Sequence, residues 1–167
     1  MSQIIWRIAT DTPLYQADDL SGAGAKATGG RWNQPGLALL YASSSRALAC
    51  LETMVHLNAG GLPLNRYLVA LTIPTNLWTQ AQIATPETLP VGWDAQPPGQ
   101  VSLQFGSNWA RSRNSCLLIV PSALVPEEQN ILINPTHPDA ARITAQKQRR
   151  WLYDPRLSRS PFAESTM

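Results

Sequence analysis

The chain contains only two cysteines and two histidines among its 167 residues. Cys50 and Cys116 both stand in apolar contexts, which favours buried reduced thiols over a disulfide framework. Cysteines and histidines at scattered positions give no zinc-binding signature, so we expect no metal site. Charged residues make up 14% of the chain, a low share for a globular protein. These shortages exclude a disulfide scaffold and a zinc module.

Long apolar runs are missing as well. No stretch approaches the roughly 20 residues that a membrane-spanning helix needs. The N-terminus lacks a basic segment followed by an apolar one, so we expect no signal peptide, no membrane partner and a cytoplasmic protein. A length of 167 residues with 44% hydrophobic content predicts one domain with a sizeable core.

Positive charge is concentrated near the C-terminus. Residues 142–159 include six basic residues and one acid. Such a segment is either an electrostatic docking surface or a solvated face, and the lack of interleaved aromatic residues favours the solvated face over nucleic-acid binding. We therefore predict a domain over 1–145 and a basic segment over 146–167. The apolar stretch 151–153 predicts that this segment packs in part on the domain.

The pattern of apolar runs and breakers predicts short elements. Strands are expected at 4–8, 37–42, 67–73, 116–120 and 130–134. A helix should begin after Ser44 or Ser45 and end within 58–61, and a shorter one should cover 107–113. Residues 10–27 look irregular, and 80–100 should form a surface connection. Strands and helices do not alternate regularly, so we predict a single α+β domain with short mixed or antiparallel strands and few helices.

One acid stands inside the predicted helix. Leu48, Leu51 and Val55 share one helical face, and Glu52 lies on or beside that face. It is the only acid between positions 19 and 87. A carboxylate against an apolar surface costs several kcal/mol unless something compensates it. This energetic cost makes Glu52 a candidate functional residue.

A glycine-rich loop carries a second candidate. In Gly29-Gly30-Arg31-Trp32-Asn33, small residues let backbone amides approach an anion, and Arg31 adds a planar fork for phosphate. The alternative is a flexible surface loop with a solvated arginine. Neither a dinucleotide-binding fingerprint nor a phosphate-binding Gly-Lys-Ser/Thr motif is present.

Four further polar residues border apolar segments. Tyr41 ends a strand, where it can stack on a ligand or fill the core. Ser122 follows a strand, where it can project into a site or cap a turn. It does not stand in the Gly-x-Ser-x-Gly motif that carries the nucleophile of many hydrolases. Asn130 either lines the site or caps a strand end. His56 lies four residues after Glu52, and the pair could do acid–base work, although a structural histidine is favoured.

These segments, taken in order, resemble the RES-domain family, the toxins of Res–Xre toxin–antitoxin modules. The matching motifs are Gly-Gly-Arg-Trp-Asn, Tyr-Ala-Ser, Leu-Glu-x-x-Val-His, Val-Pro-Ser and Asn-x-Leu-x-Asn-Pro-x-His-Pro. Each motif is weakly specific alone, but five in order over about 130 residues form a strong match.

The resemblance implies a fold similar to ADP-ribosyltransferases and an enzyme that degrades NAD⁺ by breaking its nicotinamide–ribose bond with phosphate or water. NAD⁺ would be a substrate, with no cofactor. The implied partner is a DNA-binding Xre-type antitoxin that masks the active site, and a homodimer within that complex is compatible. A protein ADP-ribosyltransferase, an RNA-targeting toxin and a non-catalytic interaction domain are the alternatives.

The resemblance also assigns roles to individual residues. The family's arginine, glutamate and serine correspond to Arg31, Glu52 and Ser122 as catalytic residues. The residues expected to bind NAD⁺ are Arg7, Arg31, Tyr41 and Asn130. Nicotinamide leaves as a neutral group, so one carboxylate suffices to stabilise the oxocarbenium-like ribose. Glu52 would take that role, and Ser122 would hold Glu52 or a ribose hydroxyl in place.

Overall fold

The computed structural model describes residues 1–57 and 62–158. Within these ranges the chain forms one seven-stranded sheet and four α-helices, which confirms the predicted α+β class. The strands are β1 (Ser2–Thr10), β2 (Leu40–Ser43), β3 (Arg66–Pro74), β4 (Gln82–Ile83), β5 (Leu117–Pro121), β6 (Gln129–Ile133) and β7 (Thr144–Arg150). The helices are α1 (Ala23–Thr28), α2 (Arg46–Met54), α3 (Thr75–Thr79) and α4 (Gln100–Ser112), with 3-10 turns η1 (Pro138–Arg142) and η2 (Pro155–Ser158). None of the described helices is long and apolar enough to cross a membrane.

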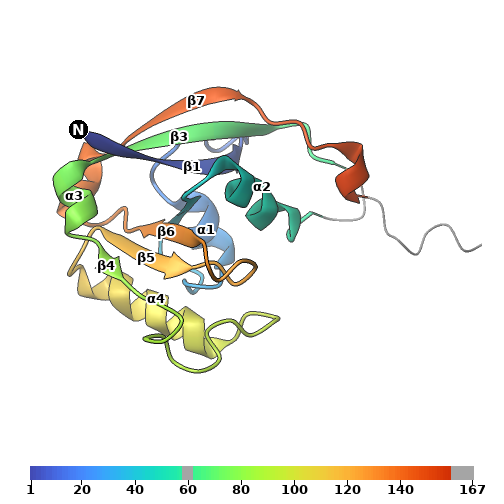
Figure 1. Cartoon of the computed structure of the whole chain (residues 1–167). Coiled ribbons are helices and arrows are strands. Elements are labelled where there is room, and N and C mark those ends of the chain that lie inside the picture. Colours follow the sequence, from blue (N-terminus) through green and yellow to red (C-terminus); the bar gives the residue numbers. More distant parts are fainter. Residues whose placement is uncertain (58–61, 159–167) are drawn as a thin grey trace, which may run out of the picture.

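The sheet is ordered β4-β5-β6-β2-β1-β3-β7, and each neighbouring pair is antiparallel except β4 with β5. Figure 1 shows β1, β3 and β7 on one level and β4, β5 and β6 on another, with β2 between them. Apolar side chains from both levels meet in one cluster, which includes Ile5 and Leu71 from the first level and Ile119 and Ile131 from the second. The sheet therefore curls over its main core.

Two helices cover the other face of the sheet. On the α2 side, Ala49 packs with Ile8 and Leu68. On the α4 side, Trp109 packs with Leu132, which alternates along β6 with residues of the main core. The strip of sheet between these two apolar clusters carries the polar side chains described below.

The five predicted strands are present, with shifted ends. Two helical predictions were inaccurate: α4 is longer than 107–113, and α1 lies in a segment expected to be irregular. The helix that holds Glu52 ends at Met54, earlier than predicted. The predicted end region 58–61 lies outside the described residues.

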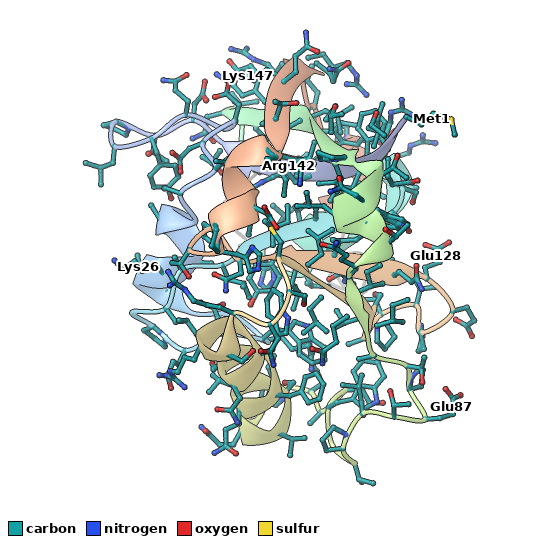
Figure 2. All side chains as sticks on the ribbon, turned by 90° about the vertical axis from the view of Figure 1, so that its left-hand side faces the viewer. Met1, Lys26, Glu87, Glu128, Arg142 and Lys147 are labelled. Atoms are coloured by element: carbon teal, nitrogen blue, oxygen red, sulfur yellow. The ribbon has the colours of Figure 1, made fainter. Side chains whose placement is uncertain are left out.

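Strand β7 was not predicted. Its sequence, Thr-Ala-Gln-Lys-Gln-Arg-Arg, shows no apolar alternation, because it is an edge strand whose side chains are mostly exposed. It pairs with β3 from Thr72↔Thr144 to Tyr67↔Arg150, so the predicted boundary at 145/146 falls inside a strand. Lys147 projects outward from β7 in Figure 2 and forms an ion pair of 2.8 Å with Asp11. The sheet, and with it the domain, extends to Arg150.

Candidate functional site

Helix α2 positions the candidate acid. Ser45 begins the helix by accepting a hydrogen bond from the backbone N–H of Leu48 at 3.1 Å, as an N-cap serine does. Leu48 and Ala49 are buried on the sheet side of the helix. Glu52 lies three and four residues further on, so it shares this side.

The prediction that Leu48, Leu51 and Val55 share the buried face was wrong. Leu51 and Val55 are 38% and 54% exposed, on the solvent side of α2. A nine-residue helix buries only a narrow stripe, and here Ala49 rather than Leu51 continues it. His56, also exposed, follows the helix.

The carboxylate of Glu52 meets polar groups of the sheet instead of an apolar surface. Its Oε1 accepts a hydrogen bond of 2.6 Å from the Ser122 hydroxyl and one of 2.7 Å from the Asn130 side-chain amide. The Asn130 oxygen in turn accepts from the Ser43 hydroxyl at 2.7 Å. Bonds to an ionised acceptor are among the stronger hydrogen bonds in proteins. Among the described residues no donor binds Oε2, so this oxygen can accept from a ligand.

Sheet pairing brings these groups together. Ser43 of β2 is directly opposite Asn130 of β6, so their side chains share a face. Val120 of β5 is opposite Asn130 in turn, and Ser122 follows just beyond. The site serine, asparagine and glutamate thus come from two strand ends and one helix.

Ser122 has a defined donor direction. Its buried hydroxyl oxygen accepts hydrogen bonds from the backbone N–H groups of Leu124 and Val125, each at 3.1 Å. Because two N–H groups occupy the lone pairs, the hydroxyl hydrogen points to Glu52. Ser122 therefore acts both as a turn serine and as a donor that holds the carboxylate.

Tyr41 stands two residues before Ser43 on β2, so it lies on the same face of the sheet. Its hydroxyl donates to the Asn33 side-chain oxygen at 2.6 Å and accepts from the Trp32 N–H at 3.1 Å. Burial raises the pKa of Tyr41 far above its usual value, so the hydroxyl stays neutral. A Cβ at Gly30 would lie 2.7 Å from this hydroxyl, which explains the glycine at that position.

Arg31 is anchored to a loop. Its guanidinium donates to the carbonyl oxygens of Trp93 and Ala95 at 3.1 and 3.0 Å, and to the side-chain oxygen of Gln96 at 3.1 Å. A guanidinium has five N–H donors, so these bonds leave two for a ligand. The catalytic and NAD⁺-binding role of Arg31 stays a prediction.

A cavity of about 160 Å³ lies where β1 and β2 part. These strands share one register pair, Trp6↔Ser43; beyond it, residues 7–10 line one side of the cavity and residues 39–41 the other. Arg7 and Tyr41, both predicted to bind NAD⁺, are among the residues that line this cavity. Arg31 is not among the lining residues.

Arg7 has little compensation for its burial. Its Nε and Nη1 are buried and have no hydrogen-bond partner among the described residues. Desolvation lowers the pKa of Arg7, while the charges of Asp19 and Tyr15 act in the opposite direction. Buried polar groups in proteins are normally hydrogen-bonded, so these N–H groups are a place for an anion.

Two site residues were not found from the sequence. Ser43 could have been, because it alternates with Tyr41 on β2 and therefore shares its face. Arg66, at the start of β3, also lines the cavity, and nothing in its sequence context distinguishes it. Within residues 1–57 and 62–158, no group of three or more histidine, cysteine or acidic side chains could hold a metal ion.

Comparisons with known proteins agree on a family. A model of the RES domain matches residues 4–155. The "Prs ADP-ribosylating toxin" of Sphingobium sp. (strain YBL2) is 65% identical over 159 residues, covering 95% of this chain and 99% of that protein. A "Toxin Res" of Photorhabdus laumondii subsp. laumondii is 38% identical over 125 residues, covering 75% and 78%.

A solved structure has the same fold. The Mycobacterium tuberculosis MbcT–MbcA toxin–antitoxin complex contains a chain that superposes with a TM-score of 0.65 at 15% identity, covering 89% of this chain and 85% of that one. At this identity the likeness concerns the fold alone. The family model and the sequence relatives show that the chain belongs to the RES domain family.

Proposed function

We propose that the chain is a toxin that binds NAD⁺ and breaks the bond between nicotinamide and ribose. The observation that carries this proposal is the Glu52 carboxylate, whose Oε1 is held by Ser122 and Asn130 while Oε2 has no donor among the described residues. A fixed carboxylate with one open oxygen suits a reaction that develops positive charge on a sugar.

The chemistry follows from the leaving group. Nicotinamide departs as a neutral molecule and takes the electron pair of the C–N bond, so no general acid has to protonate it. The ribose becomes oxocarbenium-like, and Glu52 accepts a hydrogen bond from the 2′-hydroxyl and opposes the developing charge. Tyr41, whose hydroxyl is fixed by Asn33 and Trp32, offers a ring of fixed orientation beside the cavity.

The acceptor of the ADP-ribosyl group distinguishes two reactions. Sequence reasoning alone favours degradation of NAD⁺ by water or phosphate. The 65% identical relative is named for ADP-ribosylation of Prs, and we propose the same acceptor here. A nucleophilic side chain of Prs would form a bond to the ribose carbon and release its proton.

Surface chemistry beside Glu52 supports a protein acceptor. Leu51 of α2 and Val55, which caps the C-terminal end of α2, flank the acid and are 38% and 54% exposed. Leu124, whose N–H is bonded to Ser122, is 42% exposed. Exposed apolar side chains around a polar centre are typical of protein-binding surfaces.

An antitoxin is the second proposed partner. The MbcT–MbcA structure is a toxin–antitoxin complex, and a toxin of this kind needs a protein that restrains it. The Xre type of that partner and its masking of the site remain predictions. The non-catalytic alternative, in which Glu52 is a paired structural acid, predicts that NAD⁺ levels stay unchanged when the protein is expressed.

Mass spectrometry can separate the two reactions. Purified protein is incubated with NAD⁺ and Prs, with and without phosphate, and the products are identified. The proposal predicts released nicotinamide and a Prs mass raised by one ADP-ribosyl group, both lost with Glu52→Gln. Free ADP-ribose or its phosphate adduct with unmodified Prs would instead establish NAD⁺ degradation, and unconsumed NAD⁺ would refute both.

A further inference from the structure

Arg66 lies in the wall of the cavity that also holds Arg7. It is opposite Thr10 in the β1–β3 ladder, and its carbonyl oxygen accepts a hydrogen bond of 2.8 Å from the N–H of Trp151. The backbone that carries Arg66 is therefore fixed by two neighbours. No motif or family pattern used above assigns this residue a role.

The two arginines leave several donors unpaired. Arg7 Nε and Nη1 and Arg66 Nε are buried without a hydrogen-bond partner among the described residues. Nε carries one hydrogen and Nη1 two, so four N–H groups lack an acceptor. Neither arginine belongs to an ion pair formed within the described ranges.

The acid of the cavity does not neutralise these cations. Asp19 lines the same wall, but its Oδ2 accepts from the N–H and the hydroxyl of Ser21, at 3.1 and 2.5 Å. Its charge acts on Arg7 through space without a direct ion pair. The cavity therefore keeps an excess of positive charge together with a carboxylate that can accept from sugar hydroxyls.

Arg31 lies outside the lining of this cavity. Three of its donors are bonded to the 93–96 loop, and it is absent from the lining residues. The arginine that the sequence pairs with Arg7 therefore uses three of its five donors outside the cavity. Arg66, which lines the cavity together with Arg7, is better placed than Arg31 to bind a ligand there.

We propose that Arg66 and Arg7 together bind the diphosphate group of the dinucleotide, with Asp19 on the side of the adenosine ribose. Two phosphates offer several charged oxygens, and guanidinium forks match their geometry. This inference rests on the proposed function, in which the nicotinamide ribose reaches Glu52 past Tyr41 and the adenosine part extends out of the cavity.

Calorimetric titration with ADP-ribose tests the inference without any reaction taking place. We expect Arg66→Gln to weaken ADP-ribose binding by roughly 10- to 100-fold, since a hydrogen bond to a charged group is lost. Arg66→Lys should recover part of the affinity because it retains the charge. Arg111→Gln, which removes an exposed arginine from α4, is the matched control and should leave affinity unchanged.

Further ligands identify what the cavity recognises. Inorganic diphosphate should compete with ADP-ribose in the wild type and lose this ability in Arg66→Gln, whereas nicotinamide should bind equally to both. Competition by inorganic phosphate alone, at similar concentration and with equal sensitivity to Arg66, would assign the cavity to a single phosphate and overturn the diphosphate assignment.

The outcomes separate this inference from the proposed function. If the wild type binds ADP-ribose and Arg66→Gln binds it equally well, the role of Arg66 is refuted while the proposed function stands. If the wild type neither binds ADP-ribose nor consumes NAD⁺, the proposed function itself fails. Circular dichroism and thermal melting of each variant verify that a loss of binding is not a loss of fold.

Discussion

The Glu52 cluster and the Arg7 cavity handle buried polar groups in opposite ways. In the cluster, Ser43 donates to Asn130, and both Asn130 and Ser122 donate to one oxygen of Glu52. In the cavity, the guanidinium groups of Arg7 and Arg66 have buried N–H groups that donate to no acceptor among the described residues. A satisfied network fixes a geometry, and an unsatisfied one costs stability until a ligand arrives. In the proposed function, the cluster performs the chemistry and the cavity binds the diphosphate.

Glu52→Gln should produce the largest effect. The amide keeps the shape of the side chain but removes the charge that opposes the ribose cation. We expect nicotinamide release to slow by roughly 100- to 1,000-fold, the range seen when a preorganised electrostatic group is removed. Nicotinamide is measured by chromatography after mixing with NAD⁺. A rate within a few fold of wild type would remove Glu52 from the chemistry.

Arg7→Met tests the cavity, where we expect ligand affinity and protein stability to change in opposite directions. Methionine fills similar space without unpaired donors, so ADP-ribose affinity should fall by roughly 100-fold. The ligand-free protein should become more stable by about 1–3 kcal/mol, because a buried unsatisfied group is removed. Calorimetric binding and thermal melting measure the two effects. Loss of both affinity and stability would mean that Arg7 serves the fold.

The residues of the Glu52 cluster could largely be predicted from the sequence. Arg66 of the cavity and strand β7 could not, for physical reasons. Glu52 stands out because an acid in an apolar helix is costly, Ser122 follows a predictable strand, and Asn130 stands at the start of another. The buried face of α2 was misjudged because several stripes of a short helix look equally apolar. Arg66 and β7 escaped because long-range pairing, and not local pattern, gives them their place.

Ser122→Ala probes how firmly the cluster holds its carboxylate. The change removes the donor to Glu52 and leaves the N–H groups of Leu124 and Val125 without their acceptor. We expect a stability loss of about 2 kcal/mol and a roughly tenfold slower nicotinamide release. Ser43→Ala, which removes one bond to Asn130, is the matched control and should cost less in both measurements.

Asp11→Asn should give the smallest effect, because Asp11 lies outside the lining of the cavity and pairs with Lys147 of β7. The hydrogen bond from Lys147 and one from the Ala17 N–H hold the pKa of Asp11 below its usual value of 3.8. A lowered pKa means that this contribution is present above pH 3.8 and is lost as the pH falls through the folded-state value. Asp11→Asn should therefore lower the melting temperature slightly at pH 7, and the difference from wild type should vanish at acid pH. A difference that persists there would assign the loss to something other than charge.

The division between chemistry and binding is tested most directly by the affinity of the Glu52→Gln protein for ADP-ribose, measured by calorimetry. If the cluster performs chemistry and the cavity binds the diphosphate, the dissociation constant should stay within about threefold of wild type, a difference of less than 1 kcal/mol. A loss of affinity comparable to that of Arg7→Met would contradict the account, because Glu52 would then be part of the binding site for the diphosphate end.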